Sequence, residues 1–238
     1  MPTLDAVALP DHLIANQLRG KIAVVIDILR ATTTIVEALE HGARCVVPVA
    51  SVDGARVIAH DRAGSILCGE RGGIKPDGFG LGNSPLEYSA DVVRGVDCVL
   101  TTTNGTRALH LATEADEVLI GGITNVDALC DWIKRDGRDV VLICSGTDGR
   151  VSFEDCLGAG LIVDRLGYSS TDNAAMMFHA MEGAVERFGG LRFAVESSFH
   201  AKRLIGMGFG DDVAFACEVG KSSIVPVFDS VVGEIVAD

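Results

Sequence analysis

Two pairs of one acidic and one basic residue follow apolar runs in the first third of the chain. Asp27 and Arg30 come after the run IAVVI, and Glu70 and Arg71 come after the run SILC. A carboxylate binds divalent cations and a guanidinium binds oxyanions, so each pair can hold a phosphate ester together with Mg2+. The alternatives are that Asp27 caps a helix while Arg30 lies on the surface, and that Glu70 and Arg71 form a solvated ion pair.

The segment TTTNGTR adds groups that can bind an anion. Thr103, Asn104 and Thr106 surround Gly105, and a helical pattern follows them. Hydroxyl groups, amide groups and free backbone N–H groups gather at such a helix start, which suits a phosphate. Plain N-capping by Asn104 fits the same residues.

A third junction of strand, polar loop and helix has the sequence CSGTDGRVSFED. Ser145–Thr147 are candidate anion donors there, and Glu154 or Asp155 is a candidate metal ligand. Ser152 followed by Asp155 also resembles a capping box, which would engage Asp155 within its own helix.

The same junction contains an alternative, covalent route. Cys144 and Arg150 have the C-x5-R spacing of cysteine-dependent phosphatases, in which a thiolate attacks phosphorus. The residues before Cys144 are all apolar, and LICSG contains no His or other activator. These neighbours disfavour a nucleophilic thiolate.

The fold must bring these strand ends together. Short apolar runs alternate with helical patterns, which predicts an α/β fold with a mostly parallel sheet and helices on both faces. Ligands bind such sheets at the carboxyl ends of the strands. The expected strands are Leu4–Leu9, Ile22–Ile26, Cys45–Val49, Ser65–Cys68, Asp97–Leu100, Glu117–Ile120, Val140–Cys144 and Ile224–Phe228. The helical patterns cover Ile35–Leu39, Ser51–Asp61, Asn104–Ala112, Asn125–Arg135, Ser152–Leu166, Thr171–Phe188, Phe193–Ile205 and Asp212–Gly220.

Between them, Gly69–Pro85 is a glycine-rich loop without periodicity, which is typical of a functional loop. Nothing in the sequence resembles a linker, so we expect a single unit over residues 1–238. The fold class that we expect is a three-layer α/β/α arrangement with a mostly parallel or mixed central sheet.

Composition limits the classes of partner. The 238 residues have a formal net charge of −13 and no basic block, which argues against nucleic acids and anionic membranes as partners. No apolar run is long enough for a membrane helix. The seven cysteines are scattered and never spaced CxxC, so neither disulfides nor a zinc site is expected, and a reducing cytoplasm fits best. A homo-oligomer is expected, because it is the common default for soluble enzymes.

Four segments taken together resemble the 2-phosphosulfolactate phosphatase family of coenzyme M biosynthesis. They are VVIDILRATTTI, GERGGIKPDGFGLGNSPLEY, TTTNGTRAL and CSGTDGRVSFEDCLGAG, and they span Val24 to Gly160. The resemblance implies an α/β/α fold and a Mg2+-dependent acid phosphatase. It also implies hydrolysis of (2R)-2-phospho-3-sulfolactate to 3-sulfolactate and phosphate.

We therefore expect hydrolysis by a metal-bound water, with Asp27, Arg30 and Glu70 as catalytic residues. The expected Mg2+ ligands are Asp27, Glu70 and either Glu154 or Asp155. Arg71 is expected to bind the sulfonate or carboxylate end of the substrate. The other expected substrate-binding residues are Thr103, Asn104, Gly105, Thr106, Ser145, Gly146 and Thr147. A non-catalytic binder of small phosphorylated anions is a further alternative, which the acidic residues at strand ends disfavour.

Overall fold

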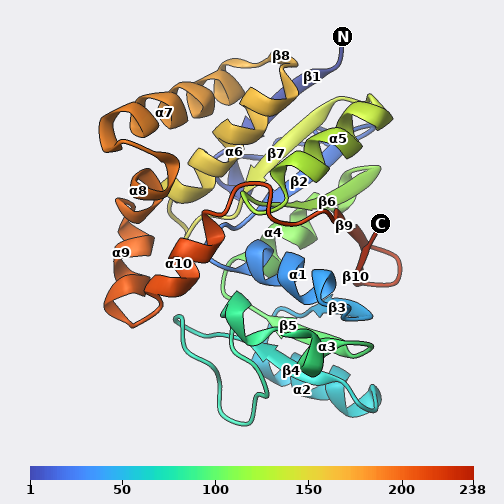
Figure 1. Cartoon of the computed structure of the whole chain (residues 1–238). Helices are drawn as coiled ribbons and strands as arrows, with labels where there is room; N and C mark the ends of the chain where they lie inside the picture. Colours follow the sequence, from blue (N-terminus) through green and yellow to red (C-terminus); the bar gives the residue numbers. More distant parts are fainter.

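Ten strands form one mixed sheet in the computed structural model, which describes residues 1–238 (Figure 1). In chain order they are β1 (Thr3–Val7), β2 (Ile22–Ile26), β3 (Cys45–Pro48), β4 (Ile66–Gly69), β5 (Asp97–Thr101), β6 (Glu117–Gly121), β7 (Val140–Cys144), β8 (Ser169–Ser170), β9 (Pro226–Asp229) and β10 (Glu234–Ala237). Their order across the sheet is β4-β5-β3-β10-β9-β6-β2-β7-β1-β8.

Ten α-helices connect the strands. They are α1 (Ala31–Glu40), α2 (Val52–Asp61), α3 (Ala90–Val93), α4 (Gly105–Leu111), α5 (Val126–Asp136), α6 (Phe153–Leu166), α7 (Asp172–Phe188), α8 (Leu191–Glu196), α9 (Phe199–Gly206) and α10 (Gly210–Ala216). Gly167 and Gly189 end α6 and α7 in the left-handed conformation that glycine adopts without a Cβ clash. None of the helices is long and apolar enough to cross a lipid bilayer.

Two groups of parallel strands, β4-β5-β3 and β6-β2-β7-β1-β8, are joined through the antiparallel hairpin of β9 and β10. The hairpin also pairs antiparallel with β3 and β6, so the two groups run in opposite directions. The loops after β2, β4, β5 and β7 nevertheless line one pocket.

The alternating directions of side chains on β2 place apolar groups on both faces of the sheet. Ile22, Val24 and Ile26 pack into a buried cluster with residues of α5, α6 and α7. Ala23 and Val25 pack into a second cluster with residues of α1 and α4. Helices thus cover both faces, and the expected α/β fold is confirmed.

Each of the eight expected strands is present, with its ends shifted by no more than two residues. Two strands, β8 and β10, lie outside the prediction. The single helix expected over Phe193–Ile205 is wrong, because α8 and α9 are separate. The hydroxyl of Ser198 accepts a hydrogen bond from the Ala201 amide and starts α9 as a new helix.

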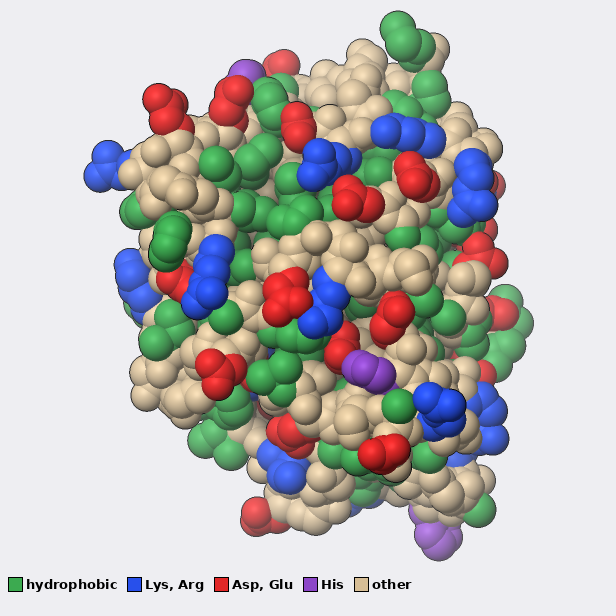
Figure 2. Space-filling view, in the orientation of Figure 1, with side chains coloured by type: hydrophobic (Ala, Val, Ile, Leu, Met, Phe, Trp, Pro, Cys, Tyr) green, Lys and Arg blue, Asp and Glu red, His purple; other side chains and the backbone are tan.

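Helices α8, α9 and α10 run along one side of the molecule, where the glycine-rich loop after β4 approaches them (Figure 1). Residues of α9 and of this loop line the same pocket. Acidic and basic side chains alternate over the face drawn in Figure 2, and no continuous basic area appears on it.

Candidate active site

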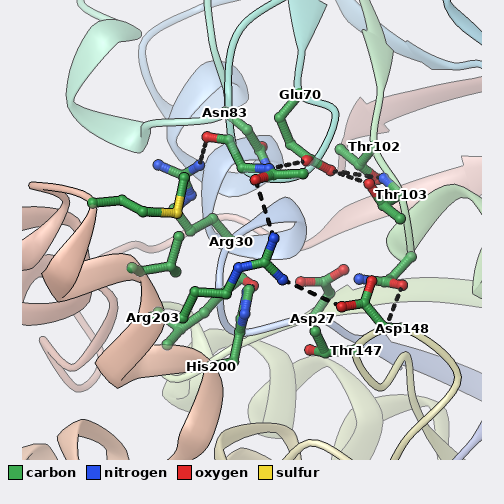
Figure 3. Close-up of a pocket in the computed structure, with 16 residues that line it drawn as sticks. Asp27, Arg30, Glu70, Asn83, Thr102, Thr103, Thr147, Asp148, His200 and Arg203 are labelled. Carbon is green, nitrogen blue, oxygen red and sulfur yellow. Dashed lines mark hydrogen bonds and ion pairs between the residues drawn. The ribbon is translucent and has the colours of Figure 1, made fainter.

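One polar pocket lies between the strand ends and α9 (Figure 3). Its lining residues are Asp27, Leu29, Arg30, Glu70, Gly72, Gly73, Asn83, Thr102, Thr103, Asn104, Thr147, Asp148, His200, Arg203, Leu204 and Met207. Only three of these sixteen residues are hydrophobic, so the pocket suits a small, highly polar ligand.

Asp27 lies on the floor of this pocket and is only 6% exposed. Its Oδ1 accepts a hydrogen bond from the Ala31 amide at the start of α1 (3.2 Å), which is the one hydrogen bond that its carboxylate accepts. Burial raises the pKa of Asp27 to about 7, and the nearby charges of Glu70 and Glu154 add to the rise. The surrounding protein therefore does not fully compensate the negative charge of this carboxylate. A bound proton or a bound cation would compensate it.

Glu70 is held by three hydrogen bonds. Its Oε1 accepts from the Thr103 amide (2.7 Å) and hydroxyl (2.9 Å), and its Oε2 accepts from the Gly73 amide (2.7 Å). The preceding Gly69 has φ of +127°, and a Cβ there would lie 1.9 Å from the Thr101 carbonyl oxygen. Only glycine allows this close approach of β4 to β5, which brings Glu70 to the pocket.

Asp155 lies behind the pocket. Its Oδ1 accepts from the Ile28 amide (2.9 Å) and its Oδ2 from the Gly146 amide (3.0 Å). Burial, followed by the charges of Asp27 and Glu154, raises the pKa of Asp155. The side chain thus fastens the loop after β2 to the loop after β7.

The capping box that the sequence suggested for α6 is not formed. Asp155 bonds outside its own helix, and the Ser152 hydroxyl pairs with the Thr147 hydroxyl (2.6 Å) without capping α6. Thr147 is thereby fixed at the edge of the pocket.

Arg30 forms a buried wall of the pocket. Its Nη1 lies 2.6 Å from Oδ2 of Asp212 on α10, and its Nη2 donates to the Gly73 carbonyl (3.0 Å). The guanidinium carbon also lies 4.1 Å from the ring centre of Phe209. This buried ion pair fixes a positive charge beside the pocket and attaches α10 to the loop after β2.

Two side chains of α9 complete the pocket. Arg203 spans its mouth, with Nη1 3.2 Å from Oδ2 of Asp148 and Nη2 3.3 Å from the Gly72 carbonyl (Figure 3). His200 places Nε2 3.0 Å from the Leu29 carbonyl, and its Nδ1 has no partner. Burial lowers the pKa of His200.

Known proteins are similar in sequence to this chain over nearly its whole length. Residues 7–230 match the family described as 2-phosphosulpholactate phosphatase. The chain belongs to this family.

A relative from Thermotoga maritima is 42% identical over 224 residues, which cover 94% of each chain. One from Carboxydothermus hydrogenoformans is 38% identical over 227 residues, which cover 94% of this chain and 92% of the relative. Both are described as probable 2-phosphosulfolactate phosphatases, and the expected class of enzyme, a phosphoric monoester hydrolase, is confirmed.

The acidic residues of this family member do not form a ready-made metal cage. No three His, Cys, Asp or Glu side chains lie close enough to hold one ion, so the expected set of three carboxylate ligands is absent. The physical reason is that Glu70 and Asp155 direct both oxygens at hydrogen-bond donors.

A Mg2+ ion does not require such a cage. It commonly binds one or two carboxylates and completes its octahedron with waters and substrate phosphate. Oε2 of the buried Glu154 lacks a hydrogen-bond partner, and the carboxylate of Asp27 accepts one hydrogen bond, at Oδ1. The charge of Glu154 raises the pKa of Asp27. Asp27, which lines the pocket, and the buried Glu154 are the carboxylates that could hold one such ion.

Six of the residues predicted from the sequence line the pocket. They are Asp27, Arg30, Glu70, Thr103, Asn104 and Thr147. Their chemical roles stay predictions.

The structure does not bring Arg71 into the pocket, where the sequence placed it. Its guanidinium donates to the carbonyls of Glu70 (2.7 Å) and Ala50 (3.0 Å) and to the Thr101 hydroxyl (2.7 Å). Arg71 therefore supports the end of β5 and does not line the pocket.

Four other residues expected to bind substrate do not line the pocket either. The Thr106 hydroxyl donates to the Thr102 carbonyl, the Ser145 side chain is buried, and the Gly146 amide donates to Asp155. Gly105 lies close behind the pocket floor, where a Cβ would meet Asp27 Oδ2 at 3.0 Å.

Three further polar residues, His200, Arg203 and Asn83, line the pocket and were not predicted from the sequence. His200, Arg203, Leu204 and Met207 all line the pocket, and their spacing of i, i+3, i+4 and i+7 marks one face of a helix. That spacing was the available signal. Asn83, in the glycine-rich loop, lines the pocket with its Oδ1 unpartnered.

The structure contradicts the covalent route through Cys144. The thiol is fully buried and lies outside the pocket lining. Its interaction with the Cys156 thiol, followed by burial, raises the pKa of Cys144. A thiol in this position stays protonated and has no access to a phosphoester.

We therefore expect Cys144→Ala to keep phosphate release within about twofold of the unmodified enzyme, since the thiol does not meet substrate. The measurement is kcat/KM for a phosphoester together with a thermal melt. A loss of 100-fold in a variant that melts normally would restore the covalent route.

Proposed function

We propose that this enzyme hydrolyses (2R)-2-phospho-3-sulfolactate to 3-sulfolactate and phosphate with Mg2+ as cofactor. The family and the descriptions of its relatives support this substrate. The observation that carries the proposal is a small polar pocket that the carboxylate of Asp27 lines together with two guanidinium groups and several hydroxyl groups. A substrate with a phosphate, a sulfonate and a carboxylate needs such a mixture.

The side chains divide the work by position. Asp27, at the pocket floor, orients the attacking water and would hold Mg2+ together with Glu154. Arg30 supplies a fixed positive charge against the developing charge of the phosphoryl group, and Thr103 and Asn104 offer donors at the start of α4. Glu70 keeps Thr103 in place through its two hydrogen bonds. Bound Mg2+ would neutralise phosphoryl oxygens and lower the pKa of a bound water.

Phosphate release from a panel of small phosphoesters tests the proposal. We expect 2-phospho-3-sulfolactate to be the best substrate, and we expect EDTA to lower its turnover by at least 100-fold, on the order expected when a charge-stabilising group is lost. Added Mg2+ should restore the rate. A melt recorded in EDTA checks that the metal-free protein stays folded.

Two results would contradict the proposal in different ways. Full turnover in EDTA would remove Mg2+ from the reaction. Tight binding of 3-sulfolactate without phosphate release from any ester would favour the non-catalytic binder. We also place the enzyme in a reducing compartment such as the cytoplasm, because all seven cysteines are unpaired and six of them are buried.

A further inference from the structure

We propose that Arg203 binds the acidic group next to the phosphoester, a sulfonate or a carboxylate, and thereby determines substrate specificity. The proposal rests on the proposed phosphatase function. It gives to α9 the role that the sequence suggested for Arg71, which faces away from the pocket.

Only two cationic side chains of Arg or Lys line the pocket, and one of them is already engaged. The side chain of Arg30 is 2% exposed and is held by Asp212, the Gly73 carbonyl and the ring of Phe209. Releasing it would leave Asp212 buried without its counter-ion, which is costly. Arg30 therefore acts as a fixed charge and does not move to a second anionic group.

Arg203 is held much more weakly. Its side chain is 40% exposed, and its partner Asp148 is 63% exposed at 3.2 Å. Such exposed pairs contribute little to stability. A substrate oxyanion can replace Asp148 at small cost, and a guanidinium suits both sulfonate and carboxylate oxygens.

The depths of the charged groups in the pocket decide which part of the substrate reaches Arg203. Asp27 is buried at the floor, whereas Arg203 lies at the mouth between Asp148 and Gly72 (Figure 3). A phosphoryl group placed at Asp27 directs the neighbouring carbons of the substrate outward. The acidic group on one of those carbons then meets Arg203.

The test compares Arg203→Gln with Lys202→Gln. Lys202 is exposed on the same helix and does not line the pocket, so its variant loses one positive charge without touching substrate. Four substrates are used. They are 2-phospho-3-sulfolactate, 2-phospholactate without the sulfonate, the phosphate ester of 2-hydroxyethanesulfonate without the carboxylate, and ethyl phosphate with neither group.

Arg203→Gln should lower kcat/KM for 2-phospho-3-sulfolactate by about 10- to 100-fold, as loss of a hydrogen-bonded charge pair does, and leave ethyl phosphate within about threefold. The ester that lacks the group bound by Arg203 should also stay within about threefold, which identifies that group as sulfonate or carboxylate. Lys202→Gln should change no substrate by more than about twofold. An equal loss on all four substrates, or no loss on any, overturns the proposal.

Asp148→Asn gives an effect of the opposite sign. Asp148 has φ of +52°, a conformation that Asn also tolerates, so the backbone is preserved. Without the competing carboxylate, KM for 2-phospho-3-sulfolactate should fall by about two- to fivefold, the size of an exposed ion pair. A higher KM contradicts the exchange of Asp148 for substrate.

The test also separates this proposal from the proposed function. If the enzyme hydrolyses 2-phospholactate and ethyl phosphate but not 2-phospho-3-sulfolactate, the proposed substrate is wrong. The effect of Arg203→Gln on kcat/KM for 2-phospholactate relative to ethyl phosphate still tests the role of Arg203. If no ester is hydrolysed, calorimetric titration with 3-sulfolactate decides. Arg203→Gln should weaken that binding by about 10-fold or more. Equal affinity in both proteins, or no binding to either, overturns the role of Arg203.

Discussion

Asp27→Asn is expected to lower kcat for 2-phospho-3-sulfolactate on the order of 10²- to 10³-fold while leaving the fold intact. The variant keeps the size of the side chain and its acceptor for the Ala31 amide at the start of α1. It removes the buried negative charge from the lining of the pocket. The measurement is phosphate release at saturating Mg2+, with circular dichroism to compare the folds. Turnover close to that of the unmodified enzyme would remove Asp27 from the reaction.

The same substitution has a second effect, on stability. Burial raises the pKa of Asp27 to about 7, so the folded protein binds the proton more tightly than the unfolded chain does. Its contribution to stability is present below the unfolded value near 4 and is lost as the pH rises through 7, with a slope of at most about 1.4 kcal/mol per pH unit. Asn at this position has no such cost. In EDTA, the variant should therefore gain stability relative to the unmodified protein between pH 5 and pH 8.

Urea unfolding at the two pH values measures this difference. A variant that is less stable than the unmodified protein at pH 8 would show that the charged carboxylate is well compensated in the metal-free fold. The activity and stability results are independent, because one requires substrate and the other does not.

The central strands could be predicted because buried parallel strands are continuously apolar. β2 and β7 are fully buried, and their runs IAVVI and VVLIC have no helical period. β8 and β10 gave no such signal. Both residues of β8 are exposed, and in β10 only Ile235 is buried, so neither strand shows an apolar run or a clear alternation.

For the site, the segments that reach the pocket could be predicted better than the side chains that point into it. Glu70 and Arg71 are neighbours after β4, yet Glu70 lines the pocket and Arg71 turns to Ala50 and Thr101. Successive residues of extended chain point to opposite sides, so both could not face one ligand. Which of the two faces the pocket depends on contacts that are distant in sequence.

The contribution of α9 could not be predicted for a related reason. The spacing of His200 and Arg203 defines a helix face but not the surface against which it packs. The partner of this face is the loop at Gly72, 131 positions away in the sequence. The buried pair of Arg30 and Asp212, which are 182 positions apart, brings the C-terminal helices to that loop.

Asp212→Asn is expected to lower the free energy of unfolding by about 3–5 kcal/mol, because it leaves the charge of Arg30 buried without a counter-ion. Oδ2 of Asp212 accepts from Arg30, and its Oδ1 accepts from the Ser84 hydroxyl (2.7 Å). The variant therefore weakens two attachments of α10 to the rest of the site. The matched control is Asp211→Asn, which changes the exposed neighbour on the same helix and should cost less than about 0.5 kcal/mol. Equal stability of the two variants in urea would show that the ion pair contributes nothing.

A double variant separates the structural role of Arg30 from its chemical role. Arg30→Met with Asp212→Leu replaces the buried pair by apolar groups, which is often neutral or stabilising, so most of the stability lost in Asp212→Asn should return. Turnover should not return, because the fixed positive charge beside the phosphoryl group is gone. If stability and turnover recover together, Arg30 only attaches α10 to the pocket, and the charge that neutralises the phosphoryl group comes from elsewhere.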